Sequence, residues 1–201
     1  MKLAVFVSGR GSNLKAILNS PELKNVIEME AVFSNKVDCP AFKIAQDFSI
    51  KTYSLGTRDG SILYEDLAAK LKQLGIELIV LAGFLKLIPD EVIRNYRWKI
   101  INIHPALLPS FGGKGMYGIN VHKAVYNSSA KVSGATIHFV DETYDTGKII
   151  AQQCVDISDV LSPEEIAERV LQIEHKLLPF VILKIAEGKV KLVGERIIIE
   201  K

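Results

Sequence analysis

The sequence predicts an α/β protein with a doubly wound, mostly parallel sheet and an antiparallel C-terminal portion. Strand-like apolar runs alternate with helix-periodic segments through the first hundred residues, as in βαβ folds. Residues 78–81 are apolar at every position, which is typical of a parallel strand buried on both faces. Residues 132–140 and 148–155 read as two strands joined by a polar turn, which predicts an antiparallel hairpin.

The composition is typical of a soluble globular protein. The chain has 201 residues, of which 48% are hydrophobic and 24% charged, and this suits one soluble globular domain. Its 25 basic and 23 acidic residues are interspersed, and no apolar run approaches the length of a bilayer span. Two cysteines without metal-ligand spacing favour a reducing cytoplasm. We expect a cytoplasmic monomer or homodimer with no nucleic-acid partner, no membrane partner and no metal.

The first elements predict an anion site. Residues 5–7 form a strand, residues 14–18 have helical spacing, and a glycine-rich turn joins them. Gly11, Ser12 and Asn13 would offer N–H groups at a helix N-terminus to a phosphate, and Ser12 and Asn13 suit the helix cap. Leu14 replaces the third glycine of the dinucleotide fingerprint, so a phosphosugar or mononucleotide-like ligand is favoured over NAD. The alternative is a tight βα turn with no ligand.

The middle of the chain continues the alternation. Helical segments are predicted at residues 41–48 and 61–74, and a short helix begins near Pro89. Strands are predicted at residues 52–54, 78–81 and 99–102, and a further helix at residues 121–126. Residues 111–118 contain four glycines and predict a flexible loop.

Asn102 and His104 lie where the last of these strands ends. They are two residues apart, so both side chains project to the same face, and Pro105 should stop the strand directly after them. Ligands bind at the carboxyl ends of strands in open α/β sheets, where an amide can stabilise an oxyanion and an imidazole can move a proton. In the alternative interpretation, Asn102 caps a turn and His104 is a satisfied structural residue.

The last helix has a marked start. Ser162 is the expected cap, Pro163 takes the first helical position, and Glu165 lies three residues after the cap. Glu174 falls on or beside the apolar face, where a buried carboxylate needs a partner such as a ligand hydroxyl. The expected buried stripe consists of Ile166, Val170, Ile173 and Leu177.

Together these motifs resemble one family. They occur in the same order as in the folate-dependent phosphoribosylglycinamide formyltransferases, and the resemblance covers nearly the whole chain. The resemblance implies a Rossmann-like formyltransferase fold, with a phosphate-binding half at residues 1–100 and a folate and catalytic half at residues 101–201 of a single domain. The matching segments are residues 9–14, 33–35, 81–84, 102–105, 107–109 and 138–140, together with Asp145 and Gly147.

The resemblance also implies the reaction and its residues. The family transfers the formyl group of 10-formyltetrahydrofolate, a co-substrate, to the amine of glycinamide ribotide in de novo purine (IMP) biosynthesis. Lys86 stands where the family often has arginine, which weakens any bidentate carboxylate contact. The catalytic residues would be Asn102, His104 and Asp145. The phosphoribosyl group would be bound by Gly11, Ser12, Asn13 and Glu174. The folate would be bound by Leu85, Lys86, Leu87, Ile88, Ile93, Asn102 and Val140.

The expected mechanism is direct attack of the amine through a tetrahedral intermediate. Asn102 and a protonated His104 would stabilise the oxyanion, and the His104 and Asp145 pair would protonate the departing nitrogen. Asp145 is expected to raise the pKa of His104. His138 is expected either to approach the site or to be structural, whereas His122 and His175 are expected on helix surfaces or behind the site.

Other functions remain open on sequence alone. Another user of the same formyl donor, either a hydrolase or a tRNA formyltransferase, is one alternative. The first would bring an extra N-terminal domain and the second an extra basic C-terminal domain, and neither is expected here. A non-catalytic nucleotide-binding module is the alternative from a different class.

Overall fold

The computed structural model describes residues 1–200. The chain divides into two compact units, Met1–Ile101 and Asn102–Lys201. Seven strands belong to one sheet in the order β3-β2-β1-β4-β5-β6-β7, and a separate two-stranded sheet pairs β8 with β9. β1 runs parallel to both β2 and β4, β2 runs parallel to β3, and β6 runs antiparallel to β7. This confirms the mostly parallel α/β class with an antiparallel C-terminal portion.

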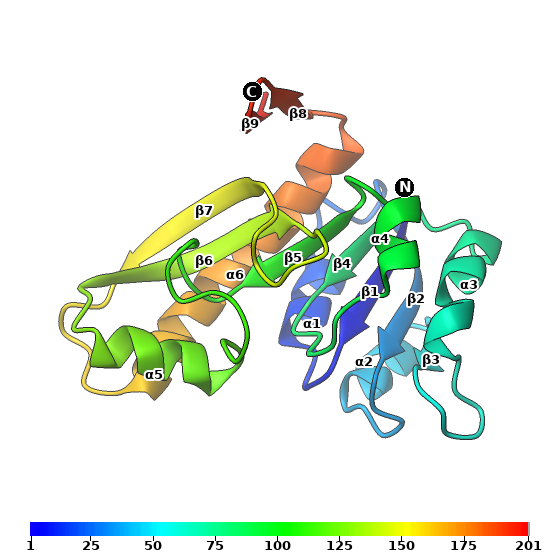
Figure 1. Cartoon of the computed structure of the whole chain (residues 1–201), viewed down its shortest axis with the longest axis horizontal. Helices are drawn as coiled ribbons and strands as arrows, with labels where there is room; N and C mark the ends of the chain where they lie inside the picture. Colours follow the sequence, from blue (N-terminus) through cyan, green and yellow to red (C-terminus); the bar gives the residue numbers. More distant parts are fainter. Residues whose placement is uncertain (201) are drawn as a thin grey trace. The chain divides into compact units, whose positions relative to one another are not determined.

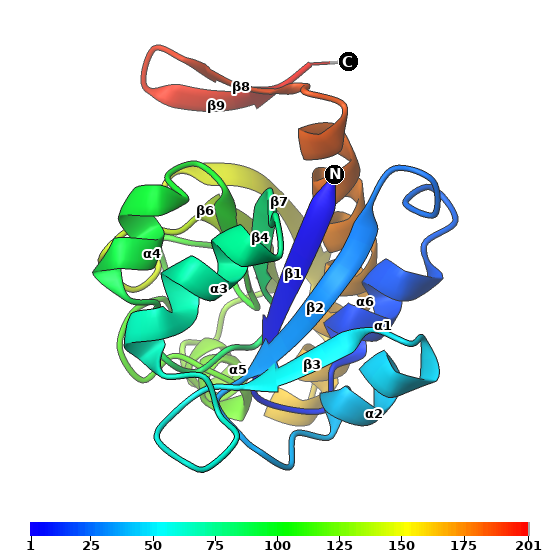
Figure 2. The same ribbon diagram turned by 90° about the vertical axis from the view of Figure 1, so that its right-hand side faces the viewer.

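The first unit alternates strands with helices, as its apolar pattern predicts. Helices α1 and α2 cover one face of its strands, and α3 and α4 cover the other (Figure 2). β1 and β4, which pair with each other, are apolar at nearly every position because helices bury both faces of these strands. The elements are β1 (Lys2–Val7), α1 (Ser12–Asn19), β2 (Glu28–Ser34), α2 (Ala41–Asp47), β3 (Lys51–Ser54), a 3-10 turn η1 (Tyr64–Asp66), α3 (Leu67–Gln73), β4 (Leu78–Leu81) and α4 (Asp90–Asn95).

The predicted helix at residues 61–74 was wrong in its first half. Ile62 forms an isolated parallel bridge with Leu55, and its N–H donates to the Ser54 carbonyl. Only then does the chain enter η1 and α3. Backbone pairing with the end of β3 therefore satisfies the residues that the apolar spacing had assigned to a helix.

The second unit is built on a hairpin backed by helices. β6 and β7 form the predicted hairpin, and α6 packs against both strands and against α5 (Figure 1). The first two residues of β5 belong to the first unit and the remainder to the second. The elements are β5 (Ile100–His104), α5 (Ile119–Asn127), β6 (Val132–Phe139), β7 (Ile149–Asp156), α6 (Pro163–Ala186), β8 (Val190–Val193) and β9 (Arg196–Ile199).

The start of α6 is as predicted. The Ser162 side chain accepts a hydrogen bond from the Glu165 N–H, and the Glu165 carboxylate accepts one from the Leu161 N–H. These bonds satisfy donors that a helix start leaves unpaired. Most of the predicted stripe is buried, but Ile173 is only half-buried.

The hairpin of β8 and β9 was not predicted. β9 contacts β7, and Lys148 at the start of β7 donates to the carboxylate of Glu195 in the hairpin turn. Among residues 1–200, no helix is both long and apolar enough to cross a membrane.

Candidate active site

Two polar side chains, those of Asn102 and His104, lie at the carboxyl end of β5. His104 is the last residue of the strand, directly before Pro105, as expected from the missing donor of proline. Its side chain is buried, whereas Asn102 is half-buried. Residues just past the strand are held by Thr136 of β6, whose hydroxyl donates to the Ala106 carbonyl and accepts from the Leu108 N–H.

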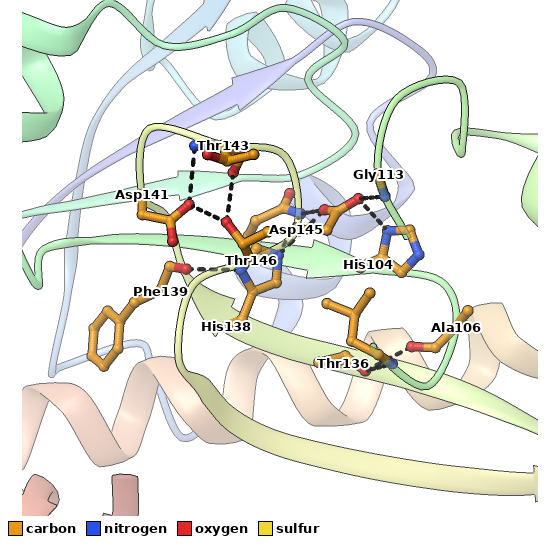
Figure 3. A network of polar contacts seen from close by, with 12 residues as sticks. His104, Ala106, Gly113, Thr136, His138, Phe139, Asp141, Thr143, Asp145 and Thr146 are labelled. Atoms are coloured by element: carbon orange, nitrogen blue, oxygen red, sulfur yellow. Dashed lines mark hydrogen bonds and ion pairs between the residues drawn. The ribbon is translucent and has the colours of Figure 1, made fainter. Parts of the chain in front are cut away.

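Asp145 reaches the same place from a distant loop. Its carboxylate points toward His104 and the Gly113 backbone (Figure 3). Oδ2 lies 3.6 Å from His104 Nδ1, and Oδ1 lies 3.5 Å from Asn102 Nδ2. The structure therefore brings together the three residues that the sequence proposed as catalytic.

The loop that carries Asp145 is braced internally. Asp141 Oδ1 accepts hydrogen bonds from the Thr143 N–H and the Thr146 hydroxyl (Figure 3). Asp145 itself has a φ of 59°, and the backbone of Gly147 passes so close to Phe139 that a Cβ there would overlap the Phe139 carbonyl. Gly147 is needed because the chain returns into β7 against the end of β6.

Residues of the glycine-rich loop after β5 connect His104 to Asp145. His104 Nε2 lies 2.8 Å from the Phe111 carbonyl oxygen, and the Gly113 N–H donates to Asp145 Oδ2 at 2.8 Å. A carbonyl oxygen only accepts, so Nε2 carries a proton and Nδ1 of the neutral ring is left with its lone pair toward Asp145. His104 can thus take up a proton at Nδ1.

His138 is a fourth member of this cluster. Its Nε2 lies 3.0 Å from Asn102 Nδ2 and 3.5 Å from Asp145 Oδ1, and its Nδ1 lies 2.7 Å from the Phe139 carbonyl oxygen. Sequence reasoning left His138 open between a site residue and a structural one. The sequence did contain a signal for a site position of His138. It lies on β6 two residues beyond Thr136, so the two side chains project to the same face of the strand.

Asp145 raises the pKa of His104 as expected, but the net pKa of His104 is lowered. Burial lowers the pKa of His104, and this outweighs the opposing effects of Asp145 and of the Phe111 carbonyl. His104 is therefore neutral near pH 7. For Asp145, burial would raise the pKa, but the neighbouring His138, the Gly113 N–H and His104 together hold it below its usual value.

His122 is buried, so of its two predicted positions, on a helix surface or behind the site, the surface position was wrong. Its Nδ1 has no hydrogen-bond partner among residues 1–200, and burial, with a smaller effect of His104, lowers its pKa to about 4. It lies on the buried face of α5 beside Val121 and Val125. His175 is half-buried, and burial lowers its pKa as well.

The predicted phosphate turn lies in the first unit. Gly11, with φ 77°, is the N-cap of α1, so the prediction that Ser12 or Asn13 caps this helix was wrong. A Cβ on Gly11 would lie 2.7 Å from the Cβ of Ala41, which explains the glycine. The first N–H groups of a helix have no acceptor within the helix itself, and an anion suits such groups.

Ser8 links this turn to the segment after β4, and sequence reasoning missed it. Its hydroxyl donates to Asn35 Oδ1 at 2.6 Å and accepts from the Leu85 N–H at 2.9 Å. Its own N–H donates to the Gly83 carbonyl. All of these partners are in the first unit. Ser8, at the start of the glycine-rich turn, therefore joins that turn to the segment proposed for folate in one hydrogen-bond network.

The remaining predicted residues differ in exposure. In the first unit, Leu85, Lys86 and Leu87 are exposed, whereas Ile88 and Ile93 are buried. In the second unit, Val140 is half-buried, and Glu174 is buried on α6 as predicted. No group of three or more histidine, cysteine, aspartate or glutamate residues in the described part of the chain could hold a metal ion.

Comparison with known proteins identifies the family. A family model described as formyl transferase matches residues 1–182. The chain is 37% identical over 189 residues to the phosphoribosylglycinamide formyltransferase of Bacillus subtilis (strain 168), covering 90% of this chain and 92% of that protein. This chain belongs to the formyl transferase family.

Other relatives of this formyl transferase carry the same name. The chloroplastic phosphoribosylglycinamide formyltransferase of Arabidopsis thaliana is 45% identical over 195 residues, or 94% of this chain. The chain spans 67% of the length of that protein and 62% of its counterpart in Vigna unguiculata. The crystal structure of phosphoribosylglycinamide formyltransferase from Anaplasma phagocytophilum has a TM-score of 0.89 at 31% identity, covering 100% of this chain and 93% of that chain. The resemblance found in the motifs is confirmed, and the protein is a one-carbon formyl transferase.

Proposed function

We propose that this formyl transferase moves the formyl group of 10-formyltetrahydrofolate to the amine of 5-phosphoribosylglycinamide, a step of de novo purine (IMP) biosynthesis. The names of its relatives support this acceptor. The observation that carries the proposal is the approach of Asp145 to within 3.6 Å of His104 and 3.5 Å of Asn102. A strand end and a loop 41 to 43 residues further along the chain thus supply an amide, an imidazole and a carboxylate to one place.

In the proposed mechanism, the substrate amine attacks the formyl carbon and a negative oxygen develops. Asn102 donates a hydrogen bond to that oxygen. Neutral His104 accepts at Nδ1 the proton that the attacking amine loses, and Asp145 stabilises the resulting imidazolium. The proton then passes to the folate nitrogen as its bond to the formyl carbon breaks. His104 is therefore a proton carrier in this proposal, in place of the protonated hydrogen-bond donor to the oxyanion that was expected from the sequence.

The binding residues are proposed from the two units separately. The N–H groups of Gly11, Ser12 and Asn13 would bind the substrate phosphate, and the Glu174 carboxylate would bind ribose hydroxyls. The folate would be bound by Leu85, Lys86, Leu87, Ile88, Ile93, Asn102 and Val140. No metal is part of this proposal. The single formyltransferase domain with two functional halves, the cytoplasmic location and the monomer or homodimer also stay predictions.

The direct test is an absorbance assay. Protein, a 10-formyl folate and glycinamide ribotide are mixed, and loss of the formyl group from the folate is followed with each component omitted in turn. The proposal requires both substrates. Formyl loss without the ribotide would instead identify a hydrolase. A solved formyltetrahydrofolate deformylase has a similar fold, but at 22% identity this likeness is evidence for the fold and not for hydrolase activity.

Variants test the assigned roles. Asn102→Ala, His104→Ala and Asp145→Ala should each lower kcat by about a hundredfold or more, as removal of an oxyanion donor or proton carrier does. Asn127→Ala, at the exposed end of α5, is a matched control for Asn102 and should leave kcat unchanged. A wild-type kcat in His104→Ala would contradict the mechanism.

A further inference from the structure

We infer that His138 is a positioning residue, whose ring turns the side-chain amide of Asn102 so that one amide hydrogen is kept for the reacting oxygen. The inference rests on the proposed function, because Asn102 is the proposed oxyanion donor. It adds to the site a residue that would not touch substrate.

The protonation of the His138 ring follows from its contact with the backbone. Nδ1 lies 2.7 Å from the carbonyl oxygen of Phe139, and a carbonyl oxygen can only accept a hydrogen bond. Nδ1 therefore carries a proton. In the neutral ring, Nε2 then has a lone pair and acts as an acceptor.

This acceptor selects one orientation of the Asn102 amide. Nε2 of His138 lies 3.0 Å from Nδ2 of Asn102, so the amide donates to the ring. The opposite orientation would place the amide oxygen against the lone pair of Nε2, which is repulsive. The two orientations have the same shape, so packing alone would not distinguish them.

The second amide hydrogen of Asn102 is held only weakly. Asp145 Oδ1 lies 3.5 Å from Nδ2, at the outer limit for a hydrogen bond, whereas the bond to His138 has an ordinary length. A developing oxyanion can take this hydrogen without breaking a strong bond. His138 thus holds one hydrogen and leaves the other available.

Removing the ring acceptor should free Asn102 to turn toward Asp145. Asp145 is a carboxylate that accepts the Gly113 N–H at Oδ2, and a charged acceptor attracts an amide more strongly than a neutral one. The hydrogen intended for the oxyanion would then be bound to Asp145. His138 is buried at 2% exposure, so water does not easily replace its Nε2.

Two substitutions separate the acceptor from the bulk of the ring. His138→Met removes the acceptor and puts an apolar side chain of similar volume in its place. His138→Gln replaces the ring acceptor with an amide oxygen that can accept from Asn102. We expect kcat to fall about tenfold to a hundredfold in His138→Met, with the KM values of both substrates changed less than about threefold. His138→Gln should recover most of the loss, and Gln153→Met on the exposed face of β7 should behave as wild type.

A double-mutant cycle tests whether His138 acts through Asn102. In an Asn102→Ala background, His138→Met should cause less than about a threefold further loss of kcat, because the group that it orients is already absent. Losses that multiply would show independent roles and overturn the inference. A His138→Met variant with wild-type kcat would overturn it as well.

Nitrogen NMR of the unliganded protein tests the same contact without substrate. The His138 ring should show a protonated Nδ1 and an unprotonated Nε2, and the Asn102 amide signal should shift in His138→Met. A proton on Nε2, or an unchanged Asn102 signal, would overturn the inference. If the wild-type protein transfers no formyl group, the proposed function fails, and these spectra alone decide whether His138 orients Asn102.

Discussion

Replacing His122 should make the stability of the protein less sensitive to acid. The imidazole of His122 is 5% exposed on α5, its Nδ1 has no hydrogen-bond partner among residues 1–200, and its pKa is lowered to about 4. His122→Met removes the titrating group and fills a similar volume. Since Nδ1 makes no hydrogen bond there, the substitution should change the free energy of unfolding at pH 7 by no more than about 1 kcal/mol.

The magnitude follows from proton linkage. Between the ordinary pKa of 6.5 and the folded value of about 4, the unfolded chain binds a proton at His122 and the folded protein does not. Stability is therefore lost as the pH falls through this window. At about 1.4 kcal/mol per pKa unit, His122 should remove about 2 kcal/mol from the free energy of unfolding between pH 7 and pH 5.

Urea unfolding of wild type and His122→Met at pH 7, 6 and 5, followed by circular dichroism, measures this difference. His104 has a lowered pKa too and destabilises both proteins in acid, so the difference between them isolates His122. His175→Met is the matched control, and its effect should be smaller because that ring is only half-buried. A difference between wild type and His122→Met that stays constant from pH 7 to pH 5 would refute the reasoning.

Three further substitutions test the supports of the site and the helix cap. Gly147→Ala should lower the free energy of unfolding by about 1 to 3 kcal/mol and should also lower kcat, because the new Cβ would overlap the Phe139 carbonyl and displace the loop of Asp145. A wild-type melting temperature and a wild-type kcat would contradict this. Thr136→Val leaves the Ala106 carbonyl and the Leu108 N–H without their hydroxyl partner. The free energy of unfolding, measured in urea, should fall by about 1 to 3 kcal/mol. Thr136→Ser keeps both hydrogen bonds, so its free energy of unfolding should fall less. Ser162→Ala removes the acceptor of the Glu165 N–H and should lower the melting temperature by the equivalent of about 1 kcal/mol, and Ser158→Ala, outside the helix, should lower it less.

Local sequence patterns were sufficient for most elements of the fold. The apolar runs of β1 and β4 and the cap at Ser162 have short-range causes, namely burial on both faces and the unpaired donors of a helix start. The end of β5 at His104 follows from Pro105 alone. The pairing of Asn102 with His104 on one face also follows from the two-residue period of a strand.

Only the tertiary structure decided the chemistry of that strand end. Asp145 raises the pKa of His104 as expected, but burial of the ring lowers that pKa by more, and the depth of burial is a property of the whole fold. The contact of His138 with Asn102 joins residues 36 positions apart, and the start of α3 was set by pairing between Leu55 and Ile62. Residue types and their spacing determined which groups reach the strand end. Their protonation and orientation depend on distances and solvent exclusion, which arise only when separate segments pack together.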